Sequence, residues 1–241
     1  MTEHIVKAFD EDLREISSQL AEMGGLAERL VAESVDALVK RDTALAQRVI
    51  AADAGVDALQ HKIEENAISI IARRQPMAQD LREIVAAIHI ANDLERVGDL
   101  AKNTAKRVLA LDGQYQAPRL LRGVEHMAEM VIEQLKEVLD AYGARDEKRA
   151  LEVWRRDGEV DAMYTSLFRE LLTYMMEDPR HITLCTHLLF CAKNIERIGD
   201  HATNIAETIY YVVVGEPLTD ERPKSDTTSL TTIAFPRRGE A

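Results

Sequence analysis

Along most of the chain, apolar residues recur every three or four positions, which is the spacing of one face of an α-helix. Two clear stripes are Val49, Val56, Leu59, Ile63 and Ile70, and Ala87, Ile90, Leu94, Val97 and Ala101. Long stretches carry this pattern without proline, which would cost about 3 kcal/mol inside a helix. The pattern predicts an all-α protein with helices over residues 5–40, 43–74, 78–111, 119–142, 146–177 and 180–213.

Short connections set the expected arrangement of these helices. Residues 40–42 and 143–146 leave room only for tight turns, so the helices that they join should be antiparallel neighbours. Three prolines fall between the helical patterns, at Pro76, Pro118 and Pro179. In the last part of the chain, residues 215–241, Pro, Thr, Ser and charged residues replace the periodic pattern. We therefore expect a disordered C-terminal tail.

The second half of the chain repeats the first. The segment ANDLERVGDLAKNTA, which starts at Ala91, returns at Ala192 as AKNIERIGDHATNIA with eight of fifteen positions identical. DAGVD, residues 53–57, returns as DGEVD, residues 157–161. Such self-similarity indicates one structural unit used twice. It predicts a tandem duplication of a three-helix bundle with pseudo-two-fold symmetry, with the two bundles over residues 1–112 and 113–214.

The composition narrows the class of protein. There are 42 Asp and Glu residues against 30 Lys and Arg, for a formal net charge of −12. That charge argues against a nucleic-acid binder and against electrostatic docking on an anionic membrane. No apolar run approaches the roughly 18 residues of a membrane span, and the N-terminus does not resemble a signal peptide. We expect a cytoplasmic protein with no membrane insertion.

Pairs of acidic residues at positions i and i+4 recur in both halves. On a helix this spacing places two carboxylates on one face, about 6 Å apart along the axis, where they repel each other. A hard cation would stabilise them, because Mg²⁺, Mn²⁺, Ca²⁺ and ferric iron prefer oxygen ligands. Two neighbouring helices with such pairs could together hold a multinuclear metal cluster. The candidate ligands are Asp53, Asp57, Glu95, Asp99, Asp157, Asp161, Glu196 and Asp200.

The competing interpretation is a solvated acidic face with local ion pairs, such as Asp93 with Arg96 and Asp99 with Lys102. A single acidic pair would favour that interpretation. The recurrence of both pairs in both halves favours a metal site instead. Glycine within each motif adds weight, because it costs about 0.5–1 kcal/mol inside a helix and is expected where another group approaches closely. These glycines are Gly98 and Gly199.

Other residues of the repeated motifs have supporting roles in this hypothesis. Asparagine oxygens could add ligands, and arginines could orient the carboxylates or meet an anion. The residues concerned are Asn103, Asn204, Arg96 and Arg197. His201 is expected to be an exposed neighbour of Asp200 rather than a ligand. The histidines and cysteines near the start of the last predicted helix fit no common zinc spacing, so we interpret them as packing residues. We find no nucleotide-binding or hydrolase motif.

The repeated motif itself resembles that of a known family. ERVGD (residues 95–99), ERIGDH (residues 196–201) and QPMAQDLRE (residues 75–83) are similar to segments of the PhoU family of phosphate-signalling proteins. The resemblance covers residues from about 5 to 213. It implies two three-helix bundles, each binding a multinuclear metal cluster through paired acidic motifs. Carried over by position, the ligands are the eight carboxylates named above. The metal would be Fe, Mn, Mg or Zn.

The resemblance also implies a regulator and not an enzyme. Such a protein would repress phosphate-starvation genes (the Pho regulon) and modulate phosphate uptake. Its expected partners are the phosphate ABC transporter and a PhoR-type sensor histidine kinase, met at the inner face of the membrane, and it would form a homodimer. Two alternatives remain open from the residues alone. One is a metal-dependent enzyme acting on phosphate compounds or iron, since two-metal sites also catalyse phosphoryl transfer. The other is a purely structural helical bundle.

Overall fold

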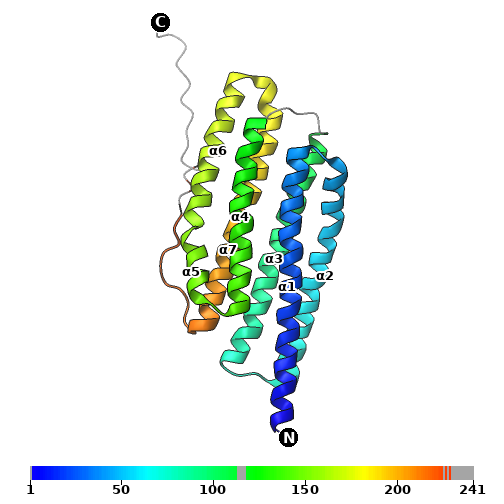
Figure 1. Cartoon of the computed structure of the whole chain (residues 1–241), viewed down its shortest axis with the longest axis vertical. Helices are drawn as coiled ribbons and strands as arrows, with labels where there is room; N and C mark the ends of the chain where they lie inside the picture. Colours follow the sequence, from blue (N-terminus) through cyan, green and yellow to red (C-terminus); the bar gives the residue numbers. More distant parts are fainter. Residues whose placement is uncertain (1, 113–117, 225, 227, 229–241) are drawn as a thin grey trace.

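The computed structural model describes residues 2–112, 118–224, 226 and 228, and its helices run along one long axis (Figure 1). The first bundle consists of α1 (Thr2–Lys40), α2 (Thr43–Arg74) and α3 (Gln79–Ala110). The second consists of α4 (Pro118–Ala144), α5 (Glu147–Arg155), α6 (Asp157–Glu177), the short helix η1 (Pro179–His181) and α7 (Ile182–Val214). The described residues contain no strand, and the predicted all-α duplication is confirmed.

The dipeptide Arg-Asp turns the chain at the same place in both bundles. Arg41 and Arg145 adopt left-handed backbone conformations, with φ of 60° and 54°, which end α1 and α4. The carboxylate of Asp42 then accepts a hydrogen bond from the backbone N–H of Leu45 at 2.8 Å. Asp146 caps α5 in the same way, and such a cap contributes about 1 kcal/mol. The local sequence therefore builds the tight antiparallel turns that were expected.

The predicted continuous helix over residues 146–177 is wrong, because the chain breaks at Arg156 between α5 and α6. The side-chain amide of Gln134, buried in α4, donates a hydrogen bond to the carbonyl of Arg156 at 3.3 Å. The guanidinium of Arg156 also forms an ion pair with Glu137 of α4. A buried amide needs a partner, and here it takes a backbone carbonyl. Ala27 holds the position of Gln134 in the first bundle, where α2 is continuous.

One hydrophobic core runs through both bundles. α3 packs against α7 and α1 packs against α4, so the two bundles share buried side chains along their common face. Leu94 of α3 and Leu135 of α4 are fully buried members of this core, and burying each such side chain contributes about 1.5–3 kcal/mol. α3 and α7, which carry the repeated motifs, therefore lie at the centre. None of the described helices is both long and apolar enough to cross a membrane.

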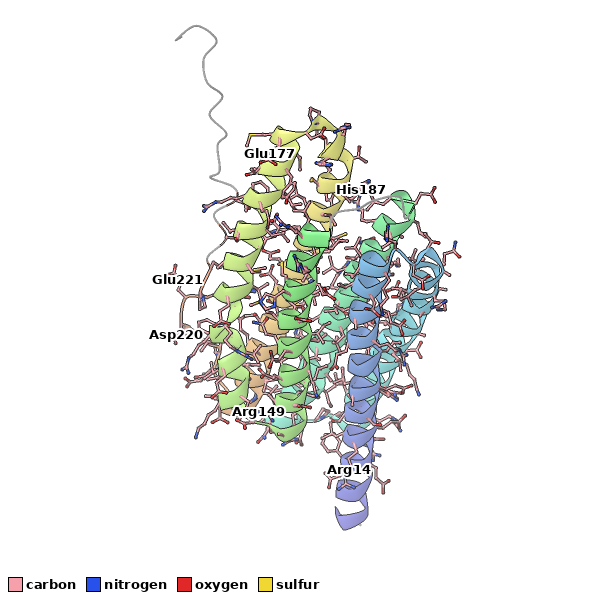
Figure 2. The ribbon with its side chains drawn as sticks, turned by 45° about the horizontal axis from the view of Figure 1, so that its top comes forward. Arg14, Arg149, Glu177, His187, Asp220 and Glu221 are labelled. Carbon is pink, nitrogen blue, oxygen red and sulfur yellow. The ribbon has the colours of Figure 1, made fainter. Side chains whose placement is uncertain are left out.

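The chain turns back after α7. Gly215 has a φ of 90°, and its N–H donates to the carbonyl of Tyr211 at 2.9 Å, which ends the helix. The following residues run alongside α5 and α6, with Asp220 and Glu221 at the outer edge (Figures 1 and 2). Residues 215–224 contain no helix or strand. This part of the tail is nevertheless not disordered as predicted, because Arg222 binds Asp157 of α6. The rest of the predicted tail, residues 229–241, lies outside the described residues, as do residues 113–117 beside the predicted domain boundary, which stays a prediction.

Candidate functional site

The acidic pairs of the first bundle meet where α2 lies against α3. Asp53 and Asp57 come from α2, whereas Glu95 and Asp99 come from α3, and the charges of the other three act on Glu95. The Nζ of Lys102, one turn beyond Asp99, donates hydrogen bonds to Asp53 Oδ2 at 2.5 Å and to Asp99 Oδ1 at 2.9 Å. The structure thus brings the predicted carboxylates together, with a cation of the chain itself among them.

Asp53 is the most buried member of this first cluster, with 2% of its surface exposed. Its second oxygen, Oδ1, is buried and has no hydrogen-bond partner among the described residues. Gly98 permits this placement, because a Cβ there would lie 3.0 Å from Asp53 Oδ1 and 3.3 Å from Val56 Cγ1. The close approach predicted for Gly98 is confirmed, and the approaching group is the carboxylate itself.

Burial and mutual repulsion shape the charges of the first cluster. Burial raises the pKa of Asp53; the hydrogen bond from Lys102 offsets part of this, and the charges of Asp57 and Asp99 add to it. Burial also raises the pKa of Glu95, and the neighbouring carboxylates raise it further. Hydrogen bonds to Asp53 and Asp99 raise the pKa of Lys102, which therefore stays charged. Lys102 and the exposed Arg96 bring two positive charges to four carboxyl groups, so the cluster can accept more positive charge.

The other motif residues of the first bundle lie toward the solvent. Arg96 is exposed, with Nε 3.4 Å from Glu95 Oε2 and Nη1 3.9 Å from Asp99 Oδ2. Arg96 can therefore orient both carboxylates, as expected. Asn103 is exposed on the surface of α3. The predicted ion pair between Asp99 and Lys102 is confirmed. Lys102 also binds Asp53, the buried carboxylate of α2, and this contact between two helices was not predicted.

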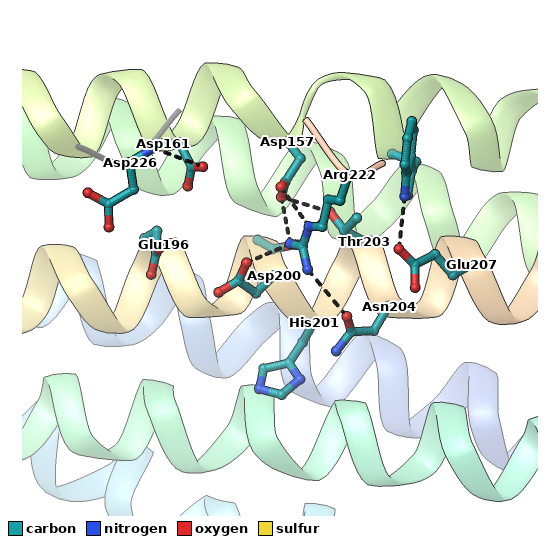
Figure 3. A network of polar contacts seen from close by, with 12 residues as sticks. Asp157, Asp161, Glu196, Asp200, His201, Thr203, Asn204, Glu207, Arg222 and Asp226 are labelled. Atoms are coloured by element: carbon teal, nitrogen blue, oxygen red, sulfur yellow. Dashed lines mark hydrogen bonds and ion pairs between the residues drawn. The ribbon is translucent and has the colours of Figure 1, made fainter. Parts of the chain in front are cut away.

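The second bundle gathers the corresponding carboxylates between α6 and α7 (Figure 3). Its central cation is Arg222, which comes from the segment after α7. Arg222 Nε donates to Asp157 Oδ2 at 2.7 Å, and Nη2 donates to Asp157 Oδ1 at 2.8 Å and to Asp200 Oδ1 at 2.5 Å. Thr203 occupies the helix position that Lys102 has in the first bundle, and its hydroxyl donates to Asp157 Oδ1 at 2.9 Å.

The other half of this second cluster is built around Glu196. Lys193 Nζ donates to Glu196 Oε1 at 2.8 Å and to Asp226 Oδ2 at 3.2 Å. The backbone N–H of Asp226 donates to Asp161 Oδ2 at 3.3 Å. Glu196 Oε2 is buried and has no hydrogen-bond partner among the described residues. Burial raises the pKa of Glu196, the bond from Lys193 opposes this shift, and the charges of Asp200 and Asp161 add to it.

Two residues of the α7 motif connect the bundles. His201, predicted to be an exposed neighbour, is instead largely covered, with Nδ1 2.8 Å from Asp93 Oδ1 of α3. Asn204 Nδ2 donates to the same oxygen at 3.3 Å, and Asn204 Oδ1 accepts from Arg222 Nη1 at 3.4 Å. The histidine is covered because α3 packs against this face of α7. Arg197 is exposed.

The second motif glycine differs from the first. A Cβ at Gly199 would lie 3.5 Å from Val160 Cγ1 and 3.6 Å from Gln134 Oε1, which are ordinary contact distances. The tight approach predicted for both glycines therefore occurs at Gly98 alone. The cysteines fit the predicted packing role, since Cys185 and Cys191 are buried and burial raises the pKa of the Cys191 thiol to about 12.

The two clusters gather carboxylates, but as they stand they do not form a metal site. In the described part of the chain, no three His, Cys, Asp or Glu side chains are spaced to hold a metal ion as they stand. Lys102 and Arg222 instead lie between the carboxylates that would have to converge. The unpartnered oxygens of Asp53 and Glu196 nevertheless offer buried ligands, and carboxylate oxygens suit hard cations.

Sequence reasoning missed the residues that come from the segment after α7, Arg222 and Asp226. That segment has no periodicity, and a lone arginine in it carries no local sign of a buried partner. The only indirect signal is in the repeat, because Thr203 replaces Lys102 and leaves the second motif without its cation. A missing charge in one copy predicts that another part of the molecule supplies it.

Comparisons with known proteins agree with this architecture. The family profile of the PhoU domain matches residues 20–108 and 124–209. The phosphate-specific transport system accessory protein PhoU homolog of Rhizobium meliloti (strain 1021) is 63% identical, over 94% of this chain and 95% of that protein. The protein of the same name from Caulobacter vibrioides (strain NA1000 / CB15N) is 54% identical, over 95% of this chain and 100% of that protein.

Two solved structures of PhoU proteins have the same fold as this chain. The crystal structure of PhoU from Pseudomonas aeruginosa superposes with a TM-score of 0.83 at 41% identity, covering 86% of this chain and all of that chain. The phosphate transport system regulatory protein PhoU from Streptococcus pneumoniae superposes with a TM-score of 0.81 at 27% identity, covering 87% of this chain and 99% of that chain. The alternatives of an enzyme and of a purely structural bundle are thereby set aside. The chain belongs to the PhoU family, a family of regulatory accessory proteins rather than enzymes.

Proposed function

We propose that this chain is a metal-binding regulatory adaptor that represses phosphate-starvation genes when phosphate is plentiful and modulates phosphate uptake. It acts in the cytoplasm as a homodimer. It links the phosphate ABC transporter to a PhoR-type sensor histidine kinase at the inner face of the membrane through protein contacts. The names of its relatives, which refer to phosphate-specific transport, support this role.

The observation that carries metal binding is the recurrence of one carboxylate cluster in both bundles, each with a buried oxygen that has no hydrogen-bond partner in the described part of the chain. These oxygens are Asp53 Oδ1 and Glu196 Oε2. A buried acceptor without a hydrogen-bond partner costs about 1–3 kcal/mol, so a protein that retains one in both clusters has a use for it. The residues that would hold metal are Asp53, Asp57, Glu95 and Asp99 in the first cluster, and Asp157, Asp161, Glu196 and Asp200 in the second.

A bound cation would supply charge neutralisation. The four carboxylates of each cluster repel one another across two helices, and a multivalent cation (Fe, Mn, Mg or Zn) would hold those helices at a fixed distance. The chain's own contribution is to orient the carboxylates from rigid helices. Arg96 restrains Glu95 and Asp99 in the first cluster, whereas Thr203 restrains Asp157 in the second.

Two measurements test the proposal. Deletion of the gene should raise a phosphate-starvation reporter in high phosphate, and the wild-type gene should restore repression. Elemental analysis of the purified protein should find metal that is lost from the variant Glu95→Ala/Asp99→Ala/Glu196→Ala/Asp200→Ala. An unchanged reporter would exclude the regulatory role, and equal metal content in both proteins would exclude the assigned ligands. Glu159→Ala, which removes an exposed carboxylate of α6, is the matched control.

A further inference from the structure

The segment that follows α7 returns to the second carboxylate cluster. Gly215 reverses the chain with its left-handed conformation, and seven residues later Arg222 lies between α6 and α7 (Figure 3). Only 18% of the Arg222 side chain is exposed. An arginine from an irregular segment is thus more covered than most charged side chains of the helices, which indicates a specific docking contact.

The segment makes its main polar contacts with the cluster, while Leu218 packs against the hydrophobic core. The guanidinium of Arg222 binds both oxygens of Asp157 and one oxygen of Asp200 at 2.5–2.8 Å. The two bonds to Asp157 have the bidentate geometry that makes arginine–carboxylate pairs strong. Farther along, the carboxylate of Asp226 accepts a hydrogen bond from Lys193. The backbone N–H of Asp226 donates a hydrogen bond to the carboxylate of Asp161. The segment therefore occupies the oxygens that a metal in this cluster would need.

The first cluster is neutralised in a different way. Lys102 belongs to α3, and its ammonium cannot leave Asp53 and Asp99 by more than the length of its own side chain. Arg222 belongs to a segment with no helix or strand, so it can leave the cluster without breaking a helix. The two clusters have equivalent carboxylates but differ in how readily their internal cation can be withdrawn.

We propose that residues 215–224 form a strap that competes with metal for the second cluster, so that metal binding there releases the strap from α6 and α7. The inference rests on the metal binding proposed above and adds what that binding does. Arg222 and a divalent cation require the same oxygens of Asp157 and Asp200. Because linkage is reciprocal, the cation weakens the docking of the strap by the same free energy as the strap weakens the binding of the cation. Metal occupancy of the second cluster is thereby converted into exposure of a segment that partners can meet.

The experiment isolates the second cluster and uses Mn²⁺ as the probe. A background of Glu95→Gln/Asp99→Asn weakens the first cluster, and circular dichroism verifies that each protein is folded. Bound Mn²⁺ is measured from the loss of the electron paramagnetic resonance signal of free Mn²⁺. The test variants are Arg222→Ala and Arg222→Lys. Lys224→Ala is the matched control. Lys224 is exposed and lies two residues after Arg222, so its replacement removes the same charge without touching the cluster.

Arg222→Ala should bind Mn²⁺ about tenfold more tightly if the docked strap holds about nine-tenths of the molecules. Arg222→Lys, which keeps the charge but not the bidentate fork, should lie between the wild type and the alanine variant. Lys224→Ala should match the wild type. In the protein with wild-type Arg222, saturating Mn²⁺ should speed amide hydrogen exchange across residues 215–224. In Arg222→Ala that exchange should already be fast without Mn²⁺.

The outcomes separate this inference from the proposed function. Equal Mn²⁺ affinity in Arg222→Ala and Lys224→Ala would overturn the strap. Exchange across residues 215–224 that ignores bound Mn²⁺ would overturn it as well, and both results would leave metal binding intact. If no variant bound Mn²⁺, the metal-binding function would fall and the strap with it. If Arg222→Ala lost Mn²⁺ binding, Arg222 would be a support of the site and not its competitor.

Discussion

Lys102 of α3 and Arg222 of the segment after α7 occupy equivalent places in the two bundles, because each binds the corresponding pair of carboxylates in its own cluster. Thr203, at the helix position of Lys102, contributes only a hydroxyl to the second cluster. The duplication has therefore preserved the carboxylates but not the source of the neutralising charge.

Lys102→Thr places in the first bundle the residue that the second bundle has at the same helix position, Thr203. In metal-free protein it should lower the free energy of unfolding by about 2 kcal/mol, because it leaves the buried carboxylate of Asp53 without its cation. Excess Mn²⁺ should recover part of that loss, since the metal replaces the ammonium. Urea unfolding with and without Mn²⁺ measures both effects. Lys106→Thr, at an exposed position one turn away, should change the free energy by less than about 0.5 kcal/mol.

Glu196→Gln should stabilise the metal-free protein at pH 7. Folding raises the pKa of Glu196 above its ordinary value of 4.5, so the folded state binds the proton more tightly than the unfolded state does. The stability that this group contributes is fully present below pH 4.5 and is lost as the pH rises through the folded pKa. Glutamine stays neutral and can still accept the bond from Lys193.

The expected gain for Glu196→Gln is about 1 kcal/mol, or about 3 °C in the midpoint of thermal unfolding. Between pH 4.5 and pH 8, the midpoint of thermal unfolding should fall less steeply for the variant than for the wild type. Glu159→Gln, at an exposed position of α6, should follow the wild-type curve. A lower melting temperature for Glu196→Gln at pH 7 would mean that the ion pair with Lys193 outweighs the cost of burial.

Asp93→Ala should loosen the contact between the two bundles. The carboxylate of Asp93 forms hydrogen bonds with both His201 and Asn204 of α7. Its loss should therefore lower the free energy of unfolding by about 1–2 kcal/mol. A double-mutant cycle with His201→Leu, which installs the residue of the first repeat at that position, should give a coupling energy of about 1 kcal/mol. A coupling energy near zero would show that packing of α3 on α7 holds the bundles without this bond.

Much of the fold could be predicted because its causes are local. The helical stripes place the helices, and the Arg-Asp dipeptides end one helix and cap the next within a few residues. The i,i+4 spacing then puts each acidic pair on one face whatever lies around it. Two such helices joined by a tight turn become neighbours, which is enough to bring Asp53 and Glu95 into one cluster.

The rest depends on contacts between residues far apart in sequence. Arginine is a good helix former. The Asp157-Gly158 dipeptide beside Arg156 is common in turns, but the buried amide that binds the Arg156 carbonyl lies far away in sequence, on α4. The position of Arg222 likewise depends on where the chain goes after Gly215, and the segment has no hydrophobic pattern that would reveal it. His201 looked exposed because Asp93, which binds it, lies on the other bundle.

The two motif glycines, Gly98 and Gly199, occupy equivalent helix positions but have different surroundings. Alanine is favoured over glycine inside a helix by about 1 kcal/mol, so each Gly→Ala change begins with a gain. At Gly199 the added methyl would meet its nearest atom at 3.5 Å, and Gly199→Ala should therefore raise the free energy of unfolding by about 0.5–1 kcal/mol. At Gly98 the methyl would meet the Asp53 carboxylate at 3.0 Å and Val56 at 3.3 Å.

Neither of those neighbours can move freely, because Lys102 holds Asp53 and the core surrounds Val56. Gly98→Ala should therefore lower the free energy of unfolding by about 1–2 kcal/mol, the usual cost of overpacking. It should also weaken Mn²⁺ binding at the first cluster, since the carboxylate must turn away from α3. Urea unfolding and Mn²⁺ titration of the two variants test this. Equal stabilisation by both would mean that α2 yields to the methyl group and that Asp53 is not held against Gly98.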